Sequence, residues 1–196
     1  MRKSTQHTGG NRQGSRQGAI DRVLQYFDNG SFDSELGNRV RYKTESQRDT
    51  SLPELHRYLD ADIIPALSAC GFDCTKYDNP LQRGGPFLLA SRIEDSAAPT
   101  VLGYGHGDVI LGQQEQWTKG EGPWQIKRDG DRLYGRGTAD NKAQHTINIA
   151  ALRAVIQERG SLGFNAKFLI EMGEEAGSAG LRELICLLYT SDAADE

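Results

Sequence analysis

Apolar residues recur at helical spacing in several stretches of the chain. Ile20, Val23, Leu24 and Phe27 predict an amphipathic helix that begins at Ala19 and ends at the Asn-Gly pair at 29–30. The same spacing predicts helices over residues 51–71, 141–159 and 178–185. In the second of these, Asp60 and Asp62 fall on the polar side, where we expect them to be solvated.

Short apolar runs bounded by glycine, proline and polar residues lie between the helical patterns. They predict strands over residues 72–77, 86–93, 100–104 and 132–135. Residues 164–172 form a nearly continuous apolar run, which is typical of a strand buried on both faces. Strands that alternate with helices indicate an α/β fold.

Composition and charge narrow the function classes. The chain has 196 residues and a formal net charge of −4, which argues against nucleic-acid binding, and no run approaches the ~18 apolar residues of a membrane span. Residues 1–18 predict a disordered polar arm and carry no secretory signal. Cys70, Cys74 and Cys186 form no C-x-x-C pair, so we expect reduced thiols in a cytoplasmic protein.

Three glycine-flanked segments, each at the end of an apolar run, hold the candidate chemistry. The first contains His106 and Asp108, the second Asp140, and the third Glu174 and Glu175. Because sites in α/β sheets lie at the carboxyl ends of strands, these groups can converge on one small volume. Imidazole nitrogen and carboxylate oxygen are both zinc ligands, so the combination predicts a metal site.

Each segment taken alone also has a plainer interpretation. The His-x-Asp pair is a weak signal by itself, Asp140 could be only the N-cap of the following helix, and adjacent glutamates are usually a solvated surface. Together they suggest a division of labour, because adjacent side chains diverge on an extended backbone. One of Glu174 and Glu175 can bind metal while the other takes a proton from water.

The three segments resemble a known family. Tyr-Gly-His-Gly-Asp-Val at 104–109, Leu-Tyr-Gly-Arg-Gly-Thr-Ala-Asp-Asn-Lys at 133–142 and Glu-Met-Gly-Glu-Glu-Ala-Gly-Ser at 171–178 resemble the co-catalytic zinc metallopeptidase and amidohydrolase family. This family includes acetylornithine deacetylase, succinyl-diaminopimelate desuccinylase, aminoacylase-1, carboxypeptidase G and carnosinase-type dipeptidases. The resemblance covers about residues 19–185. It implies a mixed sheet flanked by helices, the N-terminal part of a zinc-peptidase-like catalytic domain.

The resemblance also implies roles for the five residues. His106 would bind one metal ion and be oriented by Asp108, Asp140 would bridge two ions, Glu175 would bind the second, and Glu174 would be the general base and acid. The cofactors would be two zinc ions, with cobalt or manganese as alternatives. The substrate would be an N-acyl amino acid or a short peptide, cleaved at an amide bond. The Asp140–Asn141 peptide bond is expected to be cis, and Gly107 replaces a bulkier residue that is common in the family.

The sequence departs from the family pattern after residue 185. The family needs two more metal ligands, a lid domain that helps dimerisation, and a C-terminal part, none of which this sequence contains. Residues 186–196 resemble a translated sequencing adapter, so we expect a non-native tail. We therefore expect 19–185 to be part of a catalytic domain that binds metal weakly and turns over little. Alternatives are a non-catalytic chain that keeps the fold, and a mononuclear hydrolase.

Two further residues have open interpretations. His145 lies in the predicted 141–159 helix, where an exposed or capping position is favoured over one that faces the site. Arg136 stands between two glycines, where it either supports a turn or binds a substrate carboxylate.

Overall fold

The structure, a computed structural model, describes residues 14–192. Residues 1–13 of the expected disordered arm lie outside this range, whereas residues 16–18 of that arm are helical. In chain order the main helices and strands are α1 Arg16–Asp28, α2 Ser31–Val40, α3 Leu52–Tyr58, α4 Ile64–Ser68, β1 Asp73–Tyr77, β2 Phe87–Arg92, β3 Thr100–His106, β4 Lys127–Asp129, β5 Arg132–Tyr134, α5 Lys142–Arg159, β6 Asn165–Glu171 and α6 Leu181–Asp192.

A mixed four-stranded sheet in the order β1-β2-β6-β3 forms the centre of the fold. β6 lies between β2, to which it is antiparallel, and β3, to which it is parallel. Leu169 of β6 is opposite Leu89 on one side and Tyr104 on the other. The apolar run at 164–172 is therefore an inner strand with little exposure, as predicted, and the α/β fold is confirmed.

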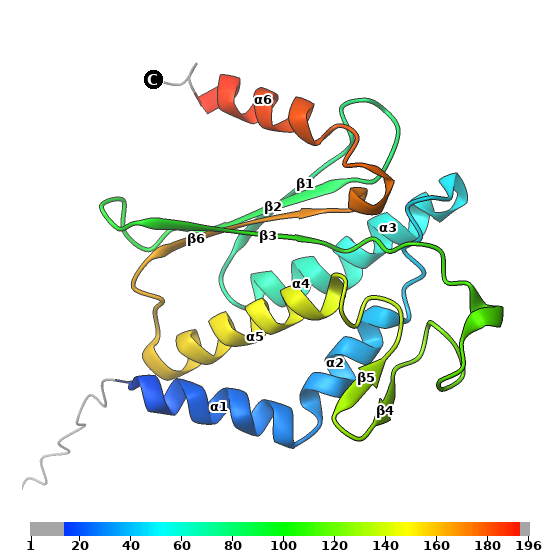
Figure 1. Ribbon diagram of the computed structural model, residues 1–196. Coiled ribbons are helices and arrows are strands. Elements are labelled where there is room, and N and C mark those ends of the chain that lie inside the picture. Colours follow the sequence, from blue (N-terminus) through cyan, green and yellow to red (C-terminus); the bar gives the residue numbers. More distant parts are fainter. Residues whose placement is uncertain (1–13, 193–196) are drawn as a thin grey trace, which may run out of the picture.

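Helices cover both faces of this sheet (Figure 1). α3, α4 and α5 lie against one face with α1 and α2 beyond them, and α6 lies on the opposite face. The main core is formed between the sheet and the α3–α5 layer by Leu55, Tyr58, Leu59, Ile63, Leu67, Leu88, Ala90, Ile149, Phe168, Ile170 and Met172, among others. Within residues 14–192, no helix is both long and apolar enough to cross a membrane.

The helices differ from the predicted ones in three ways. The sequence did not predict α2. The single helix expected over 51–71 is divided into α3, a π-helical stretch Leu59–Ile63, and α4, and the helix expected over 178–185 is α6, which begins at Leu181 and extends to Asp192. Ser178 does not begin α6, because Ser178 and Gly180 both have positive φ angles and form a loop.

Asp62 is a further correction. Its carboxylate is not solvated but accepts a hydrogen bond of 2.8 Å from Nε of the buried Arg39 on α2. Arg39 also forms an ion pair with Glu35 and donates to Thr146 Oγ1 on α5. Asp60, in contrast, is exposed as expected and pairs with Lys76. The polar side of the 51–71 segment is therefore solvated at Asp60 and packed against α2 at Asp62.

Candidate metal centre

Two parallel strands bring the first and third segments together. β3 ends at His106 and β6 ends at Glu171, and these two residues are opposite each other in the sheet. The next residue, Gly107, donates its backbone N–H to the Glu171 carbonyl at 2.9 Å. Glu174 and Glu175 then lie in a short 3₁₀ turn just beyond the end of β6. The carboxyl ends of the two strands therefore place the imidazole beside the glutamate pair, as the sequence predicted.

Asp140 reaches the same place by another route. The strand before it, β5, belongs to a separate two-stranded sheet with β4, so Asp140 does not lie at the end of a main-sheet strand. The loop before α5 presents it instead, and the peptide bond to Asn141 is cis, as the resemblance implied. The Asn141 side-chain oxygen accepts the backbone N–H of His106 at 3.3 Å, which fastens this loop to the end of β3.

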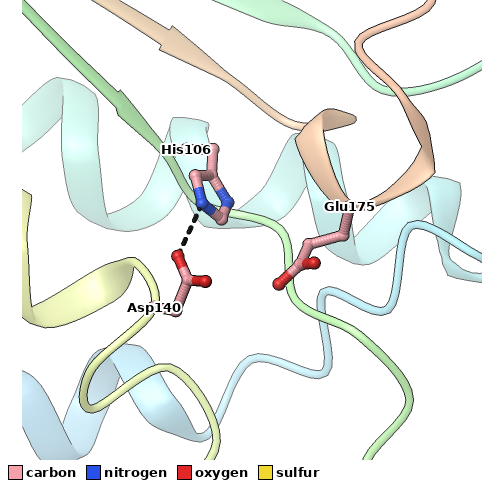
Figure 2. Close-up of side chains that lie close together, drawn as sticks. All are labelled: His106, Asp140 and Glu175. Atoms are coloured by element: carbon pink, nitrogen blue, oxygen red, sulfur yellow. Dashed lines mark hydrogen bonds and ion pairs between the residues drawn. The ribbon is translucent and has the colours of Figure 1, made fainter.

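His106, Asp140 and Glu175 converge on one point (Figure 2). Each offers one nitrogen or oxygen ligand atom, and these atoms all lie within 4.8 Å of one another. Asp140 Oδ1 is 2.9 Å from His106 Nε2. The Asp140 side chain is 68% exposed while the His106 side chain is 5% exposed, so the cluster is buried on its imidazole side and open to solvent at Asp140.

Asp108 lies behind the cluster and is completely buried. Its carboxylate accepts the backbone N–H groups of Glu174 at 3.2 Å and Glu175 at 3.0 Å. The Nδ1 atom of His106 is 3.1 Å from the Asp108 carbonyl oxygen and 3.4 Å from its carboxylate. A proton on Nδ1 is thus directed at Asp108, which leaves Nε2 facing Asp140.

The acidic surroundings shift the pKa values of the cluster. Burial by itself lowers the pKa of His106, but hydrogen bonds and charge from Asp108, together with Asp140, raise it to about 9. Burial raises the pKa of Glu175, and the neighbouring negative charge of Asp140 raises it further. Carboxylates this close repel one another, and a cation between them would relieve that repulsion.

Glu174 occupies the remaining side of the cluster. Its Oε2 atom is 3.8 Å from His106 Nε2, and its side chain is 43% exposed. It is therefore adjacent to the converging ligand atoms and accessible to water.

Two groups whose burial was not predicted from the sequence lie behind the site. His145 is fully buried, contrary to the favoured exposed or capping position, and its Nε2 is 2.5 Å from the Tyr58 hydroxyl. Lys142 is also fully buried and donates to the carbonyl oxygens of Arg39 and Tyr42. The helical spacing of 142, 145 and 146, which places them on the inner side of α5, was the available signal.

Arg136 supports the loops around the site. Its Nη2 donates to the Leu111 carbonyl oxygen at 2.9 Å, and its guanidinium lies over the Trp117 ring. These contacts favour the turn-supporting interpretation over substrate binding.

Comparisons with known proteins relate the three segments to one family. Residues 102–195 match peptidase family M20/M25/M40. The beta-Ala-His dipeptidase of Mus musculus is 39% identical over 101 residues, which are 51% of this chain and 20% of the mouse protein. The cysteinylglycine-S-conjugate dipeptidase of Corynebacterium striatum is 31% identical over 150 residues, 72% of this chain and 32% of that enzyme.

The fold gives the same relationship. The crystal structure of human carnosine dipeptidase 1 superposes with a TM-score of 0.75 at 31% identity, over 85% of this chain and 37% of that one. Each of these three matches spans less than two fifths of the relative's own length. Over residues 102–195 the sequence is therefore similar to peptidase family M20/M25/M40, and over most of the described residues the fold is similar to that of human carnosine dipeptidase 1.

Proposed function

We propose that this chain carries part of the active site of a zinc-dependent hydrolase that cleaves amide bonds in N-acyl amino acids or short peptides. The convergence of His106, Asp140 and Glu175 is the observation that supports it most directly. One imidazole and two carboxylates are a donor set that zinc accepts, and cobalt or manganese fit the same set. The dipeptidase names of the relatives favour the same chemistry.

The positions of the three ligand residues favour a two-metal arrangement. The Asp140 carboxylate has two oxygens and lies near both His106 and Glu175, so it would bridge the ions while His106 holds one and Glu175 the other. Asp108 would keep the imidazole oriented and the Glu174–Glu175 turn in place through the contacts described above. Bound zinc would lower the pKa of a coordinated water and polarise the substrate carbonyl.

Glu174 would move the proton. Its carboxylate is beside the cluster but contributes no atom to the three-residue group, so it is available to take a proton from the attacking water. The same carboxyl group would then return that proton to the leaving amine nitrogen. Water and substrate would approach from the open side at Asp140.

The number of candidate metal ligands limits the zinc affinity and the turnover that we expect of residues 1–196 alone. A catalytic zinc ion typically has three protein ligands, whereas His106 and Asp140 would serve one ion and Asp140 and Glu175 the other. We therefore propose weak zinc binding and negligible turnover for this chain by itself. The same count supports the alternative of a chain that keeps the fold without catalysis.

A zinc titration tests the proposal. The chain should bind zinc in isothermal calorimetry, and Asp140→Asn or Glu175→Gln should abolish measurable binding. Asp131→Asn, an exposed change in the β4–β5 turn, is the matched control and should bind zinc like the parent chain. If Asp140→Asn binds zinc as tightly as the control, the cluster is not the metal site. Zinc-dependent amidase activity from residues 1–196 would contradict the ligand count.

A further inference from the structure

A cavity lies beside the candidate metal centre and shares no residue with it. Its volume is about 300 Å³. It is enclosed by the segment after α2, the start of α3 and the loop before β2, and its lining residues are Ser46, Arg48, Asp49, Leu52, Leu55, Gln82, Arg83 and Gly84. None of the five candidate site residues is among them.

The lining combines an apolar floor with a hydroxyl group and two arginine side chains. Leu52 and Leu55 supply the apolar surface. The Ser46 hydroxyl is buried and has no hydrogen-bond partner within residues 14–192. Among the residues that the structure describes, the Arg48 guanidinium forms an ion pair of 3.4 Å with Glu45. A buried hydroxyl without a partner requires an explanation, and a polar ligand in the cavity supplies one.

Arg83 is presented by a loop that is firmly held. The buried side chain of Asn79 donates to the carbonyl oxygens of Gly85 and Ala179 and accepts the backbone N–H of Leu81. Between these contacts Arg83 is exposed, and within the described part of the chain it has no acidic partner. A fixed loop that carries an unpaired guanidinium is pre-organised to bind an anion.

The segment that lines the cavity also contacts the candidate metal centre. The Thr44 hydroxyl donates to the Gly107 carbonyl oxygen at 2.7 Å, next to His106. The Gln47 side chain donates to the carbonyl oxygen of Glu175 at 3.3 Å. Ser46 and Arg48, which line the cavity, flank Gln47 in the chain, so one residue connects the cavity lining to the Glu175 turn.

We propose that this cavity binds a carboxylate group carried on a short apolar stem. Arg48 is paired with Glu45, so Arg83 supplies the lining guanidinium that has no acidic partner within residues 14–192, and a guanidinium matches a carboxylate through paired N–H donors. Leu52 and Leu55 would contact the methylene carbons of the stem, and the Ser46 hydroxyl would donate to the second oxygen. The volume suits a ligand of about succinate size rather than a long chain.

Carboxylate binding itself does not depend on the metal centre. That the carboxylate belongs to the substrate, as an acidic acyl group or side chain, rests on the proposed function. Metal-free chain in EDTA therefore tests the cavity even if the hydrolase proposal fails, and zinc titration tests the metal centre even if the cavity binds nothing.

The experiment is a titration of ¹⁵N-labelled, metal-free chain with succinate, followed by amide NMR signals. We expect saturable shifts at Ser46, Arg83 and Gly84. Succinamide, which has the same size but no charge, should bind at least about ten-fold more weakly, the equivalent of one charge-assisted hydrogen bond.

Variants assign the binding to the cavity. Arg83→Gln should weaken succinate binding by about ten-fold or more, and Ser46→Ala should weaken it several-fold. Arg132→Gln, a change of another exposed arginine outside the cavity, should leave binding unchanged. Absence of saturable shifts, equal binding of succinamide, or unchanged binding in Arg83→Gln would each overturn the proposal.

Discussion

Replacing Asp108 with asparagine tests how the buried carboxylate organises the candidate metal centre. The change conserves size but removes the charge and one of the two acceptor oxygens that receive the N–H groups of Glu174 and Glu175. The new amide N–H₂ is a donor, so it faces one of those N–H groups with no acceptor between them.

The structure sets the expected magnitude. One partly buried backbone N–H loses its partner, which lowers the free energy of unfolding by about 1 kcal/mol, the lower end of the cost for a buried donor. His106 loses the negative charge 3.4 Å from its Nδ1 atom, and the Glu174–Glu175 turn loses part of its anchor. Loss of such an orienting contact typically lowers metal affinity by about 10–100-fold, or about 1.4–2.7 kcal/mol.

Zinc titration calorimetry and urea unfolding measure the two effects. Asp95→Asn is the matched control, because Asp95 also accepts a backbone N–H, from Ala97, but lies away from the cluster. The control should bind zinc like the parent chain. If Asp108→Asn binds zinc within two-fold of the parent while Glu175→Gln does not bind, the orienting role of Asp108 is refuted.

Three further changes probe the support of the site, each measured by urea unfolding. Arg39→Leu leaves two acidic partners without their buried cation and should lower the free energy of unfolding by about 3–5 kcal/mol. Arg128→Gln breaks an exposed ion pair and should change that free energy little; equal effects of the two changes would contradict this. Gly107→Ala places a Cβ against the ring of the buried Tyr58 and should lower the free energy of unfolding by about 1–3 kcal/mol; an unchanged unfolding midpoint would show that the ring moves aside without cost. Burial lowers the pKa of His145 well below its usual value, so its imidazole stays neutral in the folded state while the unfolded state takes up a proton below pH ~6.5. The free energy of unfolding should therefore decrease as the pH is lowered below ~6.5, and His145 should contribute up to about 1.4 kcal/mol per pH unit to this decrease. His145→Gln should remove that contribution; parallel pH profiles for the two chains would exclude it.

The sequence predicted the elements that have a strong period or a continuous apolar run. β6 and α5 were both expected close to their observed bounds, and β3 was expected to end two residues before its last residue, His106. α2 was missed because Ser34, Gly37 and Asn38 are weak helix formers, although Phe32, Leu36 and Val40 are spaced for one helical face. That the sheet is mixed was implied by the family resemblance rather than by the periodicity, and the strand order was not predicted.

The sequence predicted which residues form the candidate site but not which residues support them. The three segments identified His106, Asp140 and Glu175, and the structure brings these together. The groups that support these residues could not be predicted, because a half-buried Asp62 paired with Arg39 cannot be distinguished in the sequence from a solvated surface aspartate. Tertiary pairing of this kind leaves no local pattern in the sequence.

The contacts of the segment between α2 and α3 determine which fragments of this protein can keep the candidate metal centre intact. The family match begins at residue 102, yet Thr44 and Gln47 hold Gly107 and Glu175, and the carbonyl oxygens of Arg39 and Tyr42 receive Lys142. A polypeptide trimmed to the matched region would keep every candidate ligand and lose the framework that positions them. Boundaries for expressing or transplanting this centre should follow these long-range hydrogen bonds rather than the extent of sequence similarity.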